Sequence, residues 1–197
     1  MVTYEEINRN MPHWGFPVRY IKITKEMLTS IPSNIFKILD EYIDNFKREK
    51  TEGLYLFSEA SSTGKTSLAV YVVRELIFRG KLWRIEGNYH CQFWDVQNLV
   101  NEMIRCYETN EGYNELIDRC HTSDILVLDD LGKEKISEHS IRQIRMILKN
   151  RYDNLMPIIV TSNYLPKKLK LAKEEDFADV ARDIKRRLNE MTTLVEI

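Results

Sequence analysis

The chain has 197 residues, of which 43% are hydrophobic, and it contains only seven glycines and five prolines. These values predict one globular domain with a sizeable core, and the net charge of −1 gives the whole molecule no bias toward nucleic acid. No segment approaches the roughly 20 consecutive apolar residues of a membrane span, and the N-terminal residues do not form a signal peptide, so we expect neither.

The cysteine pattern argues against a disulfide framework. The three cysteines, Cys91, Cys106 and Cys120, are odd in number and widely spaced. We therefore expect reduced thiols and a cytoplasmic protein. His90 precedes Cys91, but no ligand pair has a spacing suited to zinc, so a zinc site is not predicted.

The first 32 residues have a mixed character and are predicted to form an N-terminal arm that leads into a domain spanning 33–197. The arm is too short to be a second domain, and it could wrap the core or cover the base of a bound nucleotide. A helix is predicted over Ser33–Lys50, because its apolar residues recur at helical spacing. Such a stripe is more often a core face than a partner site. Its members are Ile35, Phe36, Ile38, Leu39, Tyr42, Ile43 and Phe46.

The segment Leu54–Ala69 predicts a phosphate-binding loop. It contains an apolar strand, a turn of small residues, the tripeptide Gly64-Lys65-Thr66 and the start of an amphipathic helix. In this order, backbone N–H groups of the turn and of the helix N-terminus point at phosphate oxygens, and the helix dipole adds to their attraction. Lys65 would reach the β- and γ-phosphates of a nucleotide, and the Thr66 hydroxyl would contact Mg²⁺. The predicted nucleotide-binding residues are Ser61, Ser62, Thr63, Gly64, Lys65, Thr66 and Ser67.

Two residues depart from the usual pattern G-x-x-x-x-G-K-[ST]. Glu59 occupies the first glycine position, and Ser62 replaces another glycine that is common in such loops. Glu59 adds a negative charge to a loop that must hold a polyanion, unless its side chain points away. Ser62 lacks the freedom of glycine at positive φ. Because Gly-Lys-Thr also occurs in ordinary surface turns, the decision depends on the residues downstream.

A second apolar strand ends in two carboxylates. Asp124-Ile-Leu-Val-Leu-Asp-Asp-Leu-Gly132 describes a strand buried on both faces, with Asp129 and Asp130 at its carboxyl end. Ligands of open parallel sheets bind at that end of the strands. Asp129 would hold the hydration shell of Mg²⁺, as in a Walker B strand, and Asp130 would polarise the attacking water. The alternative is a buried strand that stops at a polar turn.

A third apolar strand ends in Thr161, Ser162 and Asn163, within Met156-Pro-Ile-Ile-Val-Thr-Ser-Asn163. A polar side chain at this position can hold the lytic water or touch the γ-phosphate, although such residues also simply start loops. Three strands that each end in a group required by a nucleotide site indicate a P-loop NTPase.

The alternation of strands and helices favours a parallel sheet covered on both faces, that is, a three-layer αβα fold. The five strands of this sheet are predicted near 54–58, 91–95, 125–129, 158–162 and 193–197. Further helices are predicted near 65–79, 96–107, 113–122, 138–154 and 176–190.

The combination of several segments resembles one branch of the AAA+ ATPases, which holds the helicase loaders of the DnaC/DnaI type and the IstB-type transposition helpers. The resemblance covers roughly Tyr55 to the C-terminus, and Tyr4–Tyr20 is similar to the lead-in of these domains. The segments are Leu128-Asp-Asp-Leu-Gly-Lys-Glu-Lys-Ile-Ser-Glu138, Lys149-Asn-Arg-Tyr152, Ile158-Ile-Val-Thr-Ser-Asn163 and Arg187-Leu188.

The resemblance implies an ATPase core without a C-terminal lid domain, which oligomerises with ATP at subunit interfaces and binds single-stranded DNA. It gives Lys65 and Thr66 the Walker A roles, Asp129 and Asp130 the Walker B roles and Asn163 that of the first sensor. It also makes Arg187 the candidate arginine finger, which a neighbouring subunit inserts to stabilise transition-state charge. Arg186 and Arg182 are close rivals. The alternative explanations of this cluster are a solvated helix face or a phosphate-contacting patch with no catalytic part.

The charges are unevenly distributed along the chain. Residues 86–130 contain ten acidic and two basic residues, whereas residues 131–188 contain fourteen basic and eight acidic residues. A positive half can follow a phosphate backbone, or the two halves can pair head to tail between subunits. The basic residues that we expect near DNA are Lys133, Lys135, Arg142, Arg145, Lys167, Lys168, Lys170 and Lys173.

Three functions remain open at this point. The first is an ATP-hydrolysing helicase loader that binds single-stranded DNA and a replicative helicase. The second is a transposition helper that acts on a transposase. The third is a nucleotide-binding scaffold with little hydrolysis, because Glu59 and Ser62 could weaken the phosphate loop.

Overall fold

The computed structural model describes residues 2–48, 52–82, 84–85, 88–89, 91–132, 138–169, 171 and 177–197. Five strands form one parallel sheet in the spatial order β4-β5-β6-β1-β7. This confirms the predicted fold class. The strands are β1 (Gly53–Phe57), β4 (Cys91–Asp95), β5 (Ile125–Asp129), β6 (Ile158–Ser162) and β7 (Thr192–Glu196). A separate antiparallel pair joins β2 (Arg84–Ile85) and β3 (Asn88–Tyr89).

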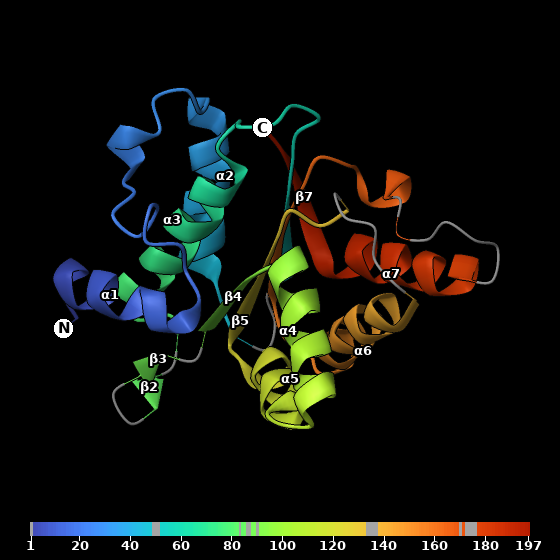
Figure 1. Ribbon diagram of the computed structural model, residues 1–197. Helices are drawn as coiled ribbons and strands as arrows, with labels where there is room; N and C mark the ends of the chain where they lie inside the picture. Colours follow the sequence, from blue (N-terminus) through green and yellow to red (C-terminus); the bar gives the residue numbers. More distant parts are fainter. Residues whose placement is uncertain are drawn as a thin grey trace.

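Helices cover both faces of the sheet (Figure 1). One face carries α1 (Tyr4–Asn10), α2 (Ser33–Asn45) and α3 (Lys65–Phe78). The other carries α4 (Val96–Thr109), α5 (Tyr113–Thr122), α6 (Glu138–Asp153) and α7 (Ala178–Met191). Three short 3-10 helices are η1 (Met11–Trp14), η2 (Lys25–Met27) and η3 (Pro166–Lys168).

The side chains of β1 show how the sheet separates two cores. Successive strand residues point to opposite faces, so Leu54 and Leu56 pack with α2 and α3, while Tyr55 and Phe57 pack with the helices of the other face. Because both faces are covered, all five residues of β1 are buried. The continuous apolar runs of the sequence reflect this burial.

The N-terminal arm wraps the first of these cores. Ile7, Met11 and Phe16 belong to the same hydrophobic cluster as Leu54. Tyr4 stacks on Phe78 of α3 with a centroid distance of 3.9 Å. The arm is therefore packed into the domain along much of its length, which matches the wrapping role that the sequence left open.

Gly15 lets the arm cover the edge strand β4. It has a φ of +87°, and a Cβ at this position would overlap the carbonyl oxygen of Phe93. Only glycine combines this left-handed conformation with such a close backbone approach. The outer edge of β4 is shielded as a result.

The predicted helix boundaries need one correction of more than two residues. The first core helix ends at Asn45 and not at Lys50, because Phe46 leaves the helical conformation with a ψ of 128°. Phe46 nevertheless remains buried, so its place in the apolar stripe was right and its secondary structure was wrong. Helix α1 and the three 3-10 helices were not predicted.

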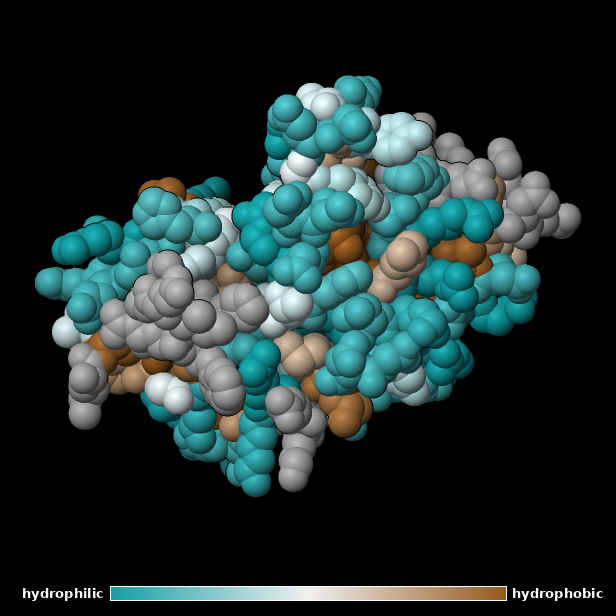
Figure 2. Space-filling view, turned by 90° about the horizontal axis from the view of Figure 1, so that it is seen from below, coloured by the Kyte–Doolittle hydropathy of each residue, from teal (hydrophilic) through white to brown (hydrophobic). Residues whose placement is uncertain are grey.

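The C-terminus lies at the top of Figure 1, and since all five strands are parallel, their carboxyl ends lie there too. The opposite face, seen from below, is mainly hydrophilic, and its apolar side chains form small separate patches (Figure 2). Within the described residues, no helix combines the length and hydrophobicity that membrane crossing requires.

Candidate functional site

The loop between β1 and α3 lies at the carboxyl end of the sheet. Two of its residues take left-handed backbone conformations, Ser62 with a φ of +60° and Gly64 with a φ of +94°. Such turns direct successive N–H groups into one concavity, which suits an anion. Gly64 is also the N-cap of α3, so the free N–H groups of that helix face the same side. Ser62 adopts the conformation in spite of its Cβ.

Lys65 is held by its own loop. Its side chain is 5% exposed. The ammonium donates hydrogen bonds to the carbonyl oxygen of Ala60 at 2.8 Å, and to the carbonyl oxygen of Ser58 and Oγ1 of Thr63, each at 3.3 Å. A phosphate in the concavity would be a stronger partner for the ammonium than these three neutral oxygens.

Asp129 and Thr66 meet beside the loop. The Thr66 hydroxyl donates to Oδ1 and Oδ2 of Asp129 at 2.9 and 3.1 Å, and the Thr161 hydroxyl donates to Oδ1 at 2.6 Å. The pKa of the Asp129 carboxyl is raised to about 6, and burial is the largest cause. The nearby carboxylates of Asp130 and Asp95 also raise this pKa, whereas the hydrogen bonds from Thr161 and Thr66 lower it. A buried carboxylate and a hydroxyl in contact form a fitting pair of ligands for a divalent cation.

Asp130 lies on the wall of a cavity of about 340 Å³ above the loop. Its φ of +61° turns the chain sharply out of β5, and its backbone N–H donates to Oγ1 of Thr161 at 2.9 Å. Thr161 thereby contacts both aspartates at the end of the strand. The cavity is lined by Arg19, Tyr20, Ser61, Ser62, Thr63, Gly64, Lys65, Thr66, Ser67 and Asp130.

All seven predicted nucleotide-binding residues line this one cavity. Arg19 and Tyr20 of the N-terminal arm line it too, but the sequence analysis did not identify them as site residues. The Arg19 guanidinium lies 5.5 Å from the centre of the Tyr20 ring. Because the arm is more than 40 positions away from the loop, only its resemblance to known lead-in segments pointed toward the site.

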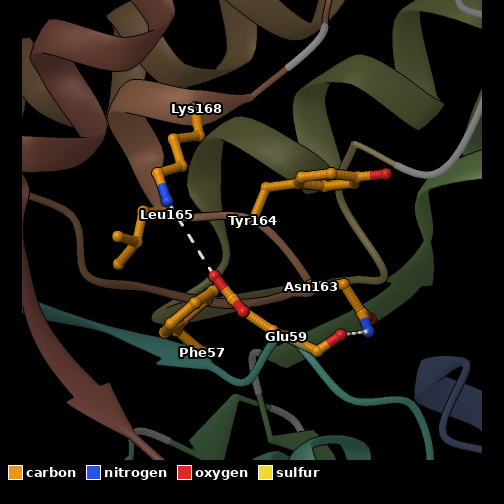
Figure 3. Close-up of a pocket in the computed structure, with 6 residues that line it drawn as sticks. All are labelled: Phe57, Glu59, Asn163, Tyr164, Leu165 and Lys168. Atoms are coloured by element: carbon orange, nitrogen blue, oxygen red, sulfur yellow. Dashed lines mark hydrogen bonds and ion pairs between the residues drawn. The ribbon is translucent and has the colours of Figure 1, made fainter.

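Asn163 contacts the phosphate loop from the other side. Its Nδ2 donates to the carbonyl oxygen of Glu59 at 3.1 Å and to Oγ of Ser61 at 3.4 Å. Its Oδ1 is buried, with no hydrogen-bond partner among the described residues. Asn163 and Glu59 line a second cavity, of about 520 Å³ (Figure 3).

The Glu59 side chain points away from the phosphate loop. It is 78% exposed and faces the ammonium of Lys168 at 3.9 Å across the second cavity (Figure 3). Its charge is therefore largely hydrated, and it does not line the cavity of Lys65 and Thr66. The sequence alone could not give this orientation.

The candidate finger Arg187 is buried, with a side chain 8% exposed, and is ion-paired with Asp183 one turn earlier. Burial alone would raise the pKa of Asp183, but hydrogen bonds from Arg187, Arg145 and Arg186 hold this pKa well below its usual range. Arg182 and Arg186 are more exposed, at 76% and 48%, and pair with carboxylates of their own helix.

Several residues singled out in the sequence fall outside the described part of the chain. These are His90, Lys133, Lys135, Ser137, Lys170 and Lys173, together with the side chain of Glu138. The DNA contacts expected of the four lysines in this group stay predictions.

Solved structures show what fold this arrangement belongs to. A DnaC helicase loader has a TM-score of 0.66 at 24% identity, over 84% of this chain and 89% of that one. DnaI has a TM-score of 0.70 at 24% identity, over 89% and 95% of the two chains. AMPPCP-bound DnaA from Aquifex aeolicus has a TM-score of 0.66 at 20% identity, over 92% and 51%. The chain has the αβα P-loop fold of these AAA+ proteins.

No protein-family model matches the sequence, and no curated protein matches it either. The similarity therefore lies in the fold.

Proposed function

We propose that this protein is an Mg²⁺-dependent ATPase that acts in DNA replication. The observation that carries the proposal is the contact between Thr66 and Asp129, at 2.9 Å, beside the cavity that Lys65 and its loop line. The hydroxyl lies in the first turn of α3 and the buried carboxylate lies at the end of β5, so two separate elements bring these groups together. They are the pair that a nucleotide-bound magnesium ion uses.

The residues present fit the nucleotide. The concavity of Ser62 and Gly64 would take phosphate oxygens, and Lys65 would exchange its loop carbonyls for the β- and γ-phosphates. Thr66 and Asp129 would hold Mg²⁺, which neutralises charge on the phosphates when it is bound. Asp130 would accept a proton from the attacking water, and Asn163 would orient that water or the γ-phosphate. Arg19 and Tyr20 would lie against the base or ribose.

The exposed position of Glu59 favours an active ATPase over an inert scaffold. Its carboxylate is separated from the phosphate cavity, so it does not repel the nucleotide at close range. Ser62 already has the backbone conformation that glycine usually supplies. Both departures from the usual motif are thus compatible with nucleotide binding.

The test is calorimetric titration with Mg·ATP and Mg·ADP, combined with measurement of phosphate release. Lys65→Ala and Asp129→Asn should each lower ATP affinity or turnover by at least about 100-fold, since each removes a charge that contacts the phosphates or the metal. Lys37→Ala is a matched control, because Lys37 is an exposed lysine of α2. No association of the wild-type protein at millimolar nucleotide would refute the proposal.

The part in replication rests on the kind of proteins that share the fold. They include a helicase loader and a DnaA bound to AMPPCP and single-stranded DNA. We propose that this chain is a cytoplasmic helicase loader, which binds single-stranded DNA and a replicative helicase. The alternative partner is a transposase. Copurification with the helicase of the same replicon, against the transposase as competitor, distinguishes the two.

We further propose that the ATPase works as a homo-oligomer with an arginine supplied in trans. Arg187 was the first candidate, and its pairing with Asp183 means that it would have to leave a buried ion pair to serve a neighbour. Arg182 is 76% exposed and needs no such change. Mixing Lys65→Ala protein with each arginine variant should restore turnover only for the residue that acts in trans. No rescue by any mixture, with assembly intact, would count against a shared site.

A further inference from the structure

A second cavity adjoins the phosphate loop without sharing a residue with the nucleotide cavity. It has a volume of about 520 Å³ and opens to solvent beside the carboxyl ends of β1 and β6 (Figure 3). It is lined by Phe57, Glu59, Asn163, Tyr164, Leu165 and Lys168. None of the roles proposed for ATP hydrolysis uses its aromatic and apolar walls.

The walls combine an aromatic ring with charged groups at the rim. In Figure 3 the Tyr164 ring lies at one side, and Glu59 and Lys168 point toward each other across the opening. Their ion pair is 3.9 Å long, and its side chains are 78% and 67% exposed. Such an exposed, long pair is worth little and is easily opened by a ligand. Lys167, next along η3, is also exposed.

Tyr164 is fixed in place by the residues around it. Its backbone N–H donates to Oγ of Ser162 at 3.0 Å, and that hydroxyl donates to the carbonyl oxygen of Leu131 at 2.6 Å. The buried Tyr55 hydroxyl donates to the carbonyl oxygen of Tyr164 at 2.7 Å. A ring whose backbone is held by two strands offers a stacking surface that loses little entropy when a ligand binds.

We propose that this cavity binds a base of single-stranded DNA. The base stacks on Tyr164, Lys168 and Lys167 contact the flanking phosphates, and the Glu59 carboxylate accepts a hydrogen bond from the exocyclic amino group of the base. Aromatic stacking beside lysines is the usual chemistry of single-strand binding. This inference rests on the proposed function, to which it adds a location and a base preference.

The hydrogen-bonding groups of the cavity favour bases that carry amino groups. Glu59 offers only acceptors, and Oδ1 of Asn163 is a buried acceptor without a described partner. Cytosine and adenine present an exocyclic amino group, and thymine does not. The Glu59 carboxylate at the rim repels DNA phosphates. A bound nucleotide would therefore turn its base, and not its phosphate, toward the cavity.

A base in this cavity would be linked to the nucleotide site. The carbonyl oxygen of Glu59 accepts the hydrogen bond of Asn163, and Asn163 also contacts Ser61 of the nucleotide cavity. Contacts at Glu59 and Asn163 therefore bear on the loop that holds the phosphates. By linkage, any effect of ATP on DNA affinity must be matched by an equal effect of DNA on ATP affinity.

The experiment measures fluorescence anisotropy of labelled (dC)20 and (dT)20 with the full chain, with and without Mg·ATP. Tyr164→Leu should weaken binding of both oligonucleotides by about tenfold, and Tyr164→Phe should not, since it keeps the stacking ring.

Wild-type protein should bind (dC)20 roughly three- to tenfold more tightly than (dT)20, and Glu59→Gln should remove that preference. Lys168→Glu should reduce the salt slope by about 1.

The controls separate a local effect from unfolding or from loss of the proposed function. Lys37→Glu makes the same charge change on α2 and should leave the salt slope unchanged. ATP affinity should be unaltered in the Tyr164 and Glu59 variants, and the melting temperature should be unaltered in Glu59→Gln. Because Tyr164 packs against the core, circular dichroism should show that Tyr164→Leu protein is folded at the temperature of the binding assay. If wild-type protein binds DNA and both Tyr164→Leu and Lys168→Glu bind equally well, the cavity is not the site, and the proposed function stands.

Two other outcomes would also overturn the inference. Wild-type protein that binds ATP but no single-stranded DNA would remove both this site and the DNA-binding part of the proposed function. Tyr164→Leu protein that keeps its DNA affinity but no longer copurifies with the helicase would show that a polypeptide occupies the cavity.

Discussion

Buried charged side chains occur at both ends of the parallel sheet, and the two ends differ in the hydrogen-bond partners of these side chains. At the amino ends of β5 and β6, the fully buried Arg151 donates to the carbonyl oxygens of Cys120 at 2.9 Å and Pro157 at 2.5 Å, and to Oγ of Ser123 at 3.1 Å. These acceptors come from the end of α5 and from the residues that enter the two strands. The guanidinium thus joins three segments of chain.

At the carboxyl ends, the buried groups have partners that a ligand could replace. Lys65 donates to carbonyls of a loop that already bends around it, and Asp129 accepts from two hydroxyls. The raised pKa of Asp129 shows that these partners do not offset its burial. One end of the sheet uses buried charge to fix the fold, whereas the other keeps buried charge for a ligand.

The largest effect that this comparison predicts is the loss of stability in Arg151→Ala. Removal of the guanidinium leaves at least three buried acceptors unpaired, so unfolding should become easier by about 3–5 kcal/mol. Urea denaturation followed by circular dichroism measures it. Folded Arg151→Ala protein should retain its ATP affinity, because the guanidinium lies at the opposite end of the sheet.

Arg105→Ala is the matched surface control. Arg105 is 60% exposed and pairs with Glu102 within one helix, so its loss should leave the urea midpoint nearly unchanged. Equal decreases in the free energy of unfolding of the two variants would mean that the buried guanidinium does not stabilise the fold more than an exposed one does.

The sheet could be predicted almost completely from sequence, and the reason is its burial. Each central strand contains an apolar run of three or four residues that is followed by a polar group, and the observed strands lie within one residue of the predicted ones. The same apolar strands predicted that Thr66, Asp129 and Asp130 lie together at the carboxyl end of the sheet. The strand order and the side-chain contacts at that end could be seen only in the structure.

Conformation within the loop and long-range contacts could not be predicted. The orientation of Glu59 away from the phosphate cavity depends on the conformation of the loop, and the place of Arg19 depends on the whole path of the N-terminal arm. The burial of Arg187, in contrast, had a signal in the sequence. Val180, Ile184, Leu188 and Met191 make an apolar helical stripe, and position 187 falls on that face.

The second prediction concerns the folded pKa of Asp129, which lies near 6 against a usual value of 3.8. Because the folded state binds the proton more tightly, ionised Asp129 destabilises the metal-free protein above pH 6, by about 3 kcal/mol at most, and this cost disappears as the pH falls toward 4. Asp129→Asn should therefore raise the melting temperature in EDTA at pH 8 and have little effect near pH 4.

Asp130→Asn is the control for that variant. Asp130 is only partly buried, so the same change should leave the stability of the metal-free protein at pH 8 nearly unaltered. Parallel pH profiles for wild-type and Asp129→Asn protein would contradict the idea that a buried carboxylate is kept at a structural cost for a cation.

The smallest expected effect tests the strain in the phosphate loop itself. Ser62 has a φ of +60°, a conformation that costs a residue with a Cβ about 1 kcal/mol relative to glycine. Ser62→Gly should be more stable than Ser62→Ala by about that amount, less the extra freedom that glycine has in the unfolded chain. Both variants lose the hydroxyl, so the difference between their urea midpoints contains only the backbone strain and the freedom of glycine in the unfolded chain. If Ser62→Ala proves more stable than Ser62→Gly by about 0.4–1 kcal/mol, as at a position without strain, the loop is not strained at this position.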